Sequence, residues 1–178
     1  EPINILASQV SALKPNWTSL SNFELEQTRE YVEEISSLST GNPLQIDAED
    51  INRVHQLSKG RPILLSLYLH FYLTNSGKAK TLLEKETENE FKEALVNNLL
   101  LLPDLVDVLP AMGRTPKGMD ISLLKRFMQN SNEDVERKFE TLKEYAFVKT
   151  FEGSDRLFLH EEMYSLLKQV IYSKPQDP

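Results

Sequence analysis

Cysteine is absent from this sequence of 178 residues, which excludes a disulfide framework and thiolate chemistry. A chain without disulfides suits a reducing compartment, and we expect a cytoplasmic protein. The sequence also lacks an uncharged apolar run of membrane-spanning length and a signal-peptide pattern. We therefore expect no membrane partner.

Positive charge is scarce. The 20 lysines and arginines stand against 27 aspartates and glutamates, which gives a formal net charge of −7. Residues 1–60 hold nine acids and four bases, so the acidity is concentrated early in the chain. Nucleic-acid phosphates bind basic surfaces, and we therefore do not expect DNA as a partner.

Motifs of common catalytic sites are missing as well. The one Gly-Lys pair, Gly77-Lys78, is followed by Ala79, and Tyr72 stands where a P-loop has its first glycine. His160-Glu161-Glu162 begins like a zinc-protease helix, but no second histidine follows at ligand spacing. We expect no metal site, no catalytic residues and no enzyme activity in this chain by itself.

Amphipathic helical patterns fill the first hundred or so residues. Asp47 is predicted to cap a helix, Gly60 to follow its end as a C′ glycine, and Pro62 to occupy the first turn of the next helix. That next helix is apolar on nearly all sides and should be buried. A loop is predicted at 75–78 and a buried strand at 3–7. The predicted helices span residues 24–37, 47–58, 63–73 and 79–102, with the glutamates of 84–90 on a solvated face.

Beyond Pro103, where we place a module boundary, the order of predicted elements changes. Three helices precede a β-hairpin, and this is the order of a winged helix. Asn132 is predicted to cap the third helix. The predicted helices are 104–109, 121–128, the one from 132, and a closing helix 160–171; the strands are 146–151 and 156–159.

Three landmarks resemble, in this order, the second half of STAND-type ATPases, the signal-transduction relatives of AAA+ proteins. Residues 20–32, with Phe23 and the run Glu26-Gln27-Thr28-Arg29-Glu30-Tyr31, resemble the start of the family's helical lid. Residues 57–65, with Gly60 and Pro62, resemble the lid's G-x-P motif. Residues 156–163 resemble the strand and histidine that open the last helix of the family's winged-helix domain. A second G-x-P sequence begins at Gly41, but acidic residues follow it instead of a long apolar helix.

The resemblance implies a mainly α fold, in which an AAA+-type helical lid precedes a winged-helix domain with one β-hairpin. Residues 1–22 would be the end of the nucleotide-binding core or a linker, 23–78 the lid, 79–103 a connecting helix and 104–174 the winged helix. The P-loop would lie upstream. The implied function is regulatory: the two modules close over ADP or ATP bound by an upstream domain, and they mediate contacts with other proteins or with copies of the parent.

Four residues carry the implied nucleotide contacts. In the family, the G-x-P proline packs on the adenine and the histidine of an M-H-D motif reaches the β-phosphate of ADP. These roles fall on Pro62 and His160 here, with Gly60 and Arg61 beside the proline. The residues flanking His160, Leu159 and Glu161, depart from the M-H-D signature.

Simpler interpretations of the same residues stay open. Gly60 and Pro62 are also explained as a helix end and a helix start, and His160 as the cap of the last helix. Two other functions compete with the regulatory one: a DNA-binding winged-helix regulator and a structural helical adaptor. The helix that would read DNA, at 132–144, has five acids and three bases, a net charge of −2, which indicates a protein partner instead.

Overall fold

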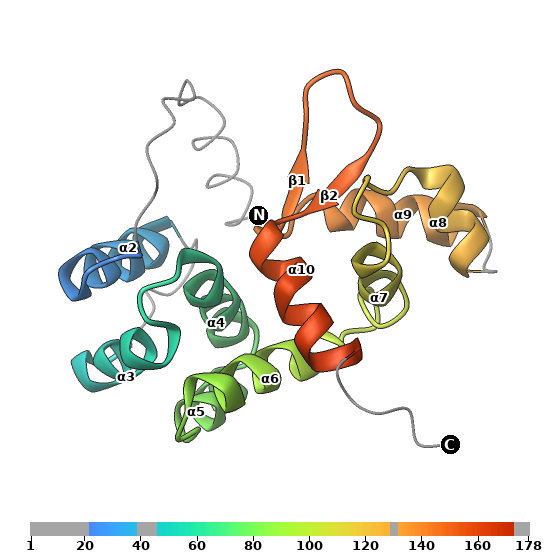
Figure 1. Cartoon of the computed structure of the whole chain (residues 1–178). Helices are drawn as coiled ribbons and strands as arrows, with labels where there is room; N and C mark the ends of the chain where they lie inside the picture. Colours follow the sequence, from blue (N-terminus) through green and yellow to red (C-terminus); the bar gives the residue numbers. More distant parts are fainter. Residues whose placement is uncertain (1–21, 39–45, 129–131, 173–178) are drawn as a thin grey trace, which may run out of the picture. The chain divides into compact units, whose positions relative to one another are not determined.

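A computed structural model describes residues 22–38, 46–128 and 132–172 (Figure 1). The described chain is mainly helical and contains one two-stranded antiparallel sheet. It divides into two compact units, Glu1–Leu95 and Val96–Pro178, and each is described by itself. The predicted strand at 3–7 and the G-x-P sequence at Gly41 lie outside the described residues.

The first unit is a group of helices packed around α3. This helix contacts α2, α4 and α5, and α4 also packs against α5. Its core contains Val54, Leu64, Tyr68 and Phe91, each with none of its surface exposed. The helices are α2 (Leu25–Leu38), α3 (Ala48–Ser58), α4 (Pro62–Thr74), α5 (Ser76–Leu83) and the first part of α6 (Glu88–Leu99).

Two predicted helix starts are confirmed. Asp47 caps α3, because its Oδ1 accepts the backbone N–H of Asp50 at 2.8 Å. Pro62 is the first residue of α4. The predicted burial of α4 on most sides is also confirmed, since its apolar side chains from Ile63 to Phe71 are nearly all buried.

The prediction of a loop at 75–78 followed by one long helix was wrong. The side chain of Asn75 accepts the backbone N–H of Lys78 at 3.1 Å, which starts α5 at Ser76. The chain then turns at residues 84–87 before α6 begins. Thr87 Oγ1 accepts the N–H of Glu90, and the Glu90 carboxylate accepts the N–H of Thr87, which is a capping box. The acidic run is therefore a turn and a helix start, not a solvated helix face.

The second unit begins in α6 and continues through a series of turns. The predicted helix at 104–109 is shifted, because hydrogen bonds such as Leu105 N–H to Leu102 O at 2.9 Å close tight turns before α7 begins at Val108. The predicted bounds of α8 are confirmed. The elements are α7 (Val108–Gly113), α8 (Ile121–Met128), α9 (Asn132–Leu142), β1 (Val148–Thr150), β2 (Leu157–Leu159), α10 (Glu161–Leu167) and a π-helical turn (Lys168–Tyr172).

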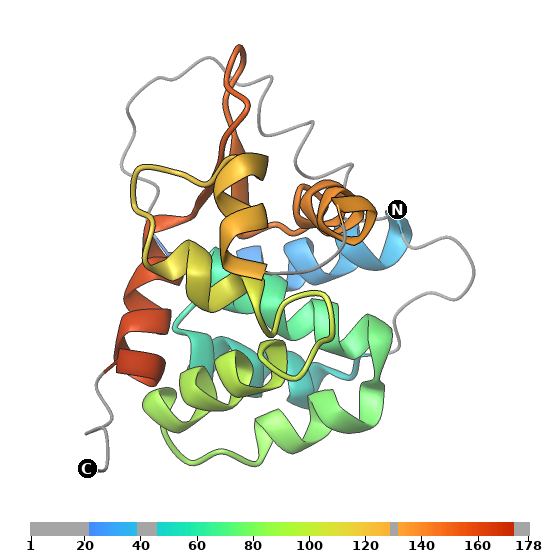
Figure 2. The same cartoon turned by 90° about the vertical axis from the view of Figure 1, so that its right-hand side faces the viewer.

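The predicted hairpin is confirmed, and a single residue outside it, Met119, also pairs with its second strand. β1 and β2 pair antiparallel, with Lys149 opposite Phe158. Met119, which lies between α7 and α8, pairs with Leu157 through two backbone hydrogen bonds of 2.8 and 2.9 Å. Both views show the hairpin extending away from the helices of its own unit (Figures 1 and 2). Within the described ranges, no helix has the length and apolar composition needed to cross a membrane.

Candidate functional site

Gly60 is required by a close approach of two backbone segments. Its φ is +66°, and it follows Lys59, whose φ is +53°. Gly60 O accepts the N–H of Phe23 at 2.8 Å. A Cβ on Gly60 would lie 2.0 Å from Phe23 O, so no other residue fits without moving the chain. Lys59 is the C-cap of α3 in a left-handed conformation, and Gly60 follows it at C′ with a positive φ, as predicted. Gly60 is also needed for the contact with Phe23.

The first two landmarks therefore meet in the structure. Thr28 on α2 is fully buried, and its Oγ1 lies 2.8 Å from Nδ1 of His55 on α3. Tyr31 Oη lies 2.7 Å from Ser66 Oγ on α4. Ser66 Oγ donates to Pro62 O at 2.9 Å, so Tyr31 donates to Ser66. A chain of hydrogen bonds runs from α2 to the first turn of α4.

Pro62 stands exposed at the start of a buried helix. The residues that follow it, Ile63 and Leu64, are 6% and 0% exposed, so the helix below the proline is anchored in the core. Arg61 is the N-cap residue, and its side chain makes no capping hydrogen bond. The positive end of the α4 dipole therefore lies beside Pro62 without a side-chain acceptor from its cap residue.

Four charged residues gather next to this helix start, and we call them the Glu88 cluster: Lys59, Arg61, Glu88 and Lys92. The Glu88 carboxylate is 2.6 Å from Lys59 Nζ and 3.3 Å from Arg61, and it also pairs with Lys92 Nζ. Burial alone would raise the pKa of Glu88, but the hydrogen bonds from Lys59 and Lys92 and the charge of Arg61 outweigh it and hold the pKa at about 2.

Three members of the Glu88 cluster were not predicted as site residues. Lys59 flanks the G-x-P motif directly, and Glu88 and Lys92 have the i, i+4 spacing of a helical ion pair. These signals were visible in the sequence. The sequence did not show that α6 faces the start of α4, because this depends on the break between α5 and α6.

His160 is the N-cap residue of α10. Its side-chain Nδ1 accepts the backbone N–H of Glu162 at 3.3 Å. The backbone N–H of His160 donates to Phe147 O at 2.8 Å. Burial lowers the pKa of His160, nearby Lys149 lowers it further, and Glu162 opposes the shift. Since Nδ1 accepts a hydrogen bond, the proton of the neutral ring is on Nε2. The capping interpretation of His160 has direct geometric support.

Three of the four predicted nucleotide contacts are consecutive in the chain, and the fourth lies in the other unit. Gly60, Arg61 and Pro62 form the start of α4 in the first unit, whereas His160 belongs to the second unit. The first three offer a rigid proline ring, a helix N-terminus and a guanidinium, which suit an aromatic base and an anion. His160 offers a neutral Nε2–H donor.

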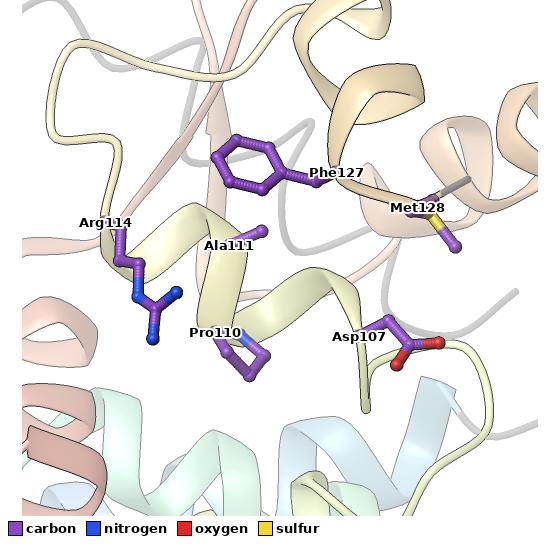
Figure 3. Close-up of a pocket in the computed structure, with 6 residues that line it drawn as sticks. All are labelled: Asp107, Pro110, Ala111, Arg114, Phe127 and Met128. Atoms are coloured by element: carbon purple, nitrogen blue, oxygen red, sulfur yellow. The ribbon is translucent and has the colours of Figure 1, made fainter.

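Two surface hollows lie elsewhere. One, of about 330 Å³, is in the second unit, where Asp107 and Arg114 flank α7 at its two ends and Phe127 of α8 faces it (Figure 3). The other, of about 470 Å³, is in the first unit and is lined by residues of α3 and α5, including Asp50 and Lys80. None of the four predicted residues lines either hollow. Among the described residues, no group of three or more histidines and acids is placed to hold a metal.

Comparison of the chain with protein-family models, with curated proteins and with solved structures finds no match.

Proposed function

We propose that this chain is the lid and winged-helix part of a nucleotide-switched, STAND-type signalling ATPase of the cytoplasm. The observation that carries the proposal is the backbone hydrogen bond from Phe23 to Gly60. It joins two stretches of sequence, residues 20–32 and 57–65, that each resemble a different lid motif. In a lid, such a junction would hold the G-x-P proline in place, and the Tyr31–Ser66–Pro62 hydrogen bonds support the same helix start.

The second unit supports the winged-helix half of the proposal. A helix, a short paired segment at Met119, two further helices and a hairpin follow one another, and this is the order of elements in a winged helix. His160 comes directly after β2, where the family's histidine opens the last helix.

The nucleotide would be ADP or ATP, held in the parent protein by an upstream nucleotide-binding domain. Pro62 would pack on the adenine, with Gly60 and Arg61 beside it, while the Nε2–H of His160 would donate to the β-phosphate. A hydrogen bond from a neutral donor to a charged acceptor contributes about 1.5–3 kcal/mol. Each module would thus contribute one contact, and ADP would favour the closed state. Opening would expose surfaces for other proteins or for copies of the parent. The chain itself would not hydrolyse nucleotide, because it contains no P-loop.

The test separates the capping role of His160 from the nucleotide contact. In the parent protein, His160→Ser keeps an oxygen that can cap α10 but removes the imidazole, whereas His160→Ala removes both. We expect both variants to lose ADP faster than the unmodified protein during gel filtration, with higher basal signalling activity. If His160→Ser retains ADP like the unmodified protein, His160 is a structural cap and the adaptor function is favoured.

Binding of DNA by α9 is disfavoured by its ion pairs. Arg137 lies 3.0 Å from Asp134, Lys138 lies 3.9 Å from the same carboxylate and is buried, and Lys143 lies 2.6 Å from Glu140. Arg137 and Lys138 face a carboxylate of the same helix, and Lys143, one residue beyond its end, faces Glu140, so little positive charge is offered to a phosphate backbone. We expect no sequence-selective duplex binding at physiological salt, and a salt-sensitive gel shift at submicromolar protein would promote the DNA-binding alternative.

A further inference from the structure

The Glu88 cluster holds an anion supplied by the protein itself. Three cations converge on one carboxylate, so the four side chains together carry two net positive charges. The Glu88 and Lys92 side chains are only 17% and 10% exposed, and solvent screens them less than it screens a surface pair. The cluster lies at the start of α4, a helix of thirteen residues whose positive end adds to the same field.

We propose that Glu88 is an intramolecular substitute for a ligand phosphate, and that Lys59, Arg61 and Lys92 form an anion site which a phosphate enters by displacing the Glu88 carboxylate. This inference rests on the proposed nucleotide function for the identity of the natural ligand. It extends that function to Lys59, Lys92 and Glu88, to which the family resemblance gives no role.

The charge balance favours exchange over simple addition. One carboxylate neutralises one of the three cations, whereas a terminal phosphate with nearly two negative charges neutralises two. If the carboxylate stayed in place, the phosphate would also meet like charge at hydrogen-bonding distance. Departure of Glu88 needs no movement of the main chain, because the Thr87–Glu90 capping box holds the first turn of α6 independently of the Glu88 side chain.

Protonation does not open the site near neutral pH. The pKa of Glu88 is about 2, so the carboxylate stays ionised through the physiological range. Only a competing anion releases the three cations from it. Glu88 therefore lowers phosphate affinity and sets the ligand concentration at which the site fills.

Calorimetric titration of the 178-residue chain with inorganic pyrophosphate at constant ionic strength tests this exchange. We expect Glu88→Gln to bind pyrophosphate about tenfold more tightly than the unmodified chain, a difference of about 1.4 kcal/mol. Glu86→Gln is the matched control, since Glu86 is an exposed residue of the preceding turn and the charge change is the same. Adding Lys59→Gln to Glu88→Gln should remove the gain. Equal pyrophosphate affinity for the Glu88→Gln and Glu86→Gln variants overturns the proposal.

A second variant guards against loss of structure. If Glu88→Gln loses helical circular dichroism, Glu88→Asp replaces it, because a carboxylate drawn back by one methylene keeps its charge but loosens its hold on Lys59 and Arg61. The same tighter binding is expected, to a smaller extent, and its absence in a folded Glu88→Asp protein rejects the exchange.

The outcomes distinguish this inference from the proposed function. If Glu88→Gln binds pyrophosphate tightly while His160→Ser and Pro62→Ala leave ADP retention by the parent unchanged, the anion site stands and the proposed contacts of Pro62 and His160 with ADP are rejected. If those two variants lose ADP but Glu88→Gln does not change pyrophosphate affinity, the contacts with ADP stand and the exchange at Glu88 is rejected.

Discussion

The two units differ in how many buried polar side chains they contain. Of the buried polar side chains in the described residues, Thr28, Ser58 and Lys92 belong to the first unit and Lys138 to the second. The side chains of the Lys125–Glu136 ion pair in the second unit are 33% and 59% exposed, against 10% and 17% for Lys92 and Glu88 in the first unit. A polar group removed from water gains or loses more from its partner than one at the surface. We therefore expect single substitutions to have larger effects in the first unit.

The glycines with positive φ provide the strongest test of this difference. Gly60→Ala places a Cβ 2.0 Å from the backbone oxygen of Phe23, and backbone cannot rotate away as a side chain can. We expect a loss of at least about 3 kcal/mol in the free energy of unfolding, beyond the 1–2 kcal/mol or so of a left-handed alanine. Urea unfolding followed by circular dichroism measures it.

Two glycines of the second unit are the matched controls. A Cβ on Gly118 would lie 2.6 Å from the ring of Phe158, whereas a Cβ on Gly153 would have no atom within 4 Å. Gly118→Ala should therefore be intermediate, and Gly153→Ala should cost only about 1–2 kcal/mol. A Gly60→Ala protein as stable as Gly153→Ala would show that the contact with Phe23 does not constrain the first unit.

Removal of one hydroxyl group from each of three tyrosines tests the same difference between the units. Tyr68 is fully buried, and its hydroxyl has no hydrogen-bond partner in the part of the chain that the structure describes. Tyr31 donates to Ser66, and Tyr164 of the second unit donates to Thr115 O at 3.2 Å. We expect Tyr68→Phe to stabilise the protein by about 1 kcal/mol and Tyr31→Phe to destabilise it by a similar amount.

Tyr164→Phe should destabilise less than Tyr31→Phe, because its hydrogen bond is longer and water can replace the lost partner more easily. Thermal unfolding of the three variants under one buffer gives the order. If Tyr68→Phe is the most destabilising of the three, the Tyr68 hydroxyl is hydrogen-bonded in solution and its burial carries no penalty.

Each unit also contains a histidine that should make stability depend on pH. Burial lowers the pKa of His70 on α4, and burial followed by the charge of Lys149 lowers that of His160. A histidine with a lowered pKa in the folded state binds protons more readily when unfolded. The stabilisation is complete above the unfolded pKa of about 6.5 and is lost as the pH falls from there through the folded pKa.

Urea midpoints at about pH 7.5 and about pH 5.5, on either side of the unfolded histidine pKa, should therefore differ, with the lower stability in acid. His70→Gln and His160→Ser should each flatten part of this dependence, in the first and the second unit respectively. A chain whose midpoint stays constant across this range, with both histidines present, contradicts the lowered pKa values.

The smallest effect is expected at the exposed ion pair between α8 and α9. Lys125 Nζ lies 3.0 Å from Glu136, with 33% and 59% of the two side chains exposed. A double-mutant cycle with Lys125→Ala and Glu136→Ala should give a coupling free energy of less than about 0.5 kcal/mol. A larger coupling would mean that polar contacts of the second unit matter as much as those of the first.

Prediction from sequence succeeded where a feature depends on neighbouring residues. The bounds of α8, the Asp47 cap and the position of Pro62 follow from hydrophobic periodicity and capping chemistry within one helical turn. The Thr87–Glu90 capping box was equally local, but the amphipathic helical period continues across residues 84–87 and concealed it. The Asn75 cap was also local, but the run Asn75-Ser76-Gly77 predicted a loop instead of a helix start.

By itself, the sequence determined the hairpin and the order of most helices, the break between α5 and α6 excepted, because caps, proline at a helix start and periodic burial act over one to four residues. Only the tertiary structure decided that Gly60 must be glycine, since the obstacle is the backbone of Phe23, on another segment. It also decided that Lys59, Arg61 and Lys92 surround one carboxylate. Such contacts join residues that are distant in the chain, and they form only when packing of the apolar helix faces has set which segments meet.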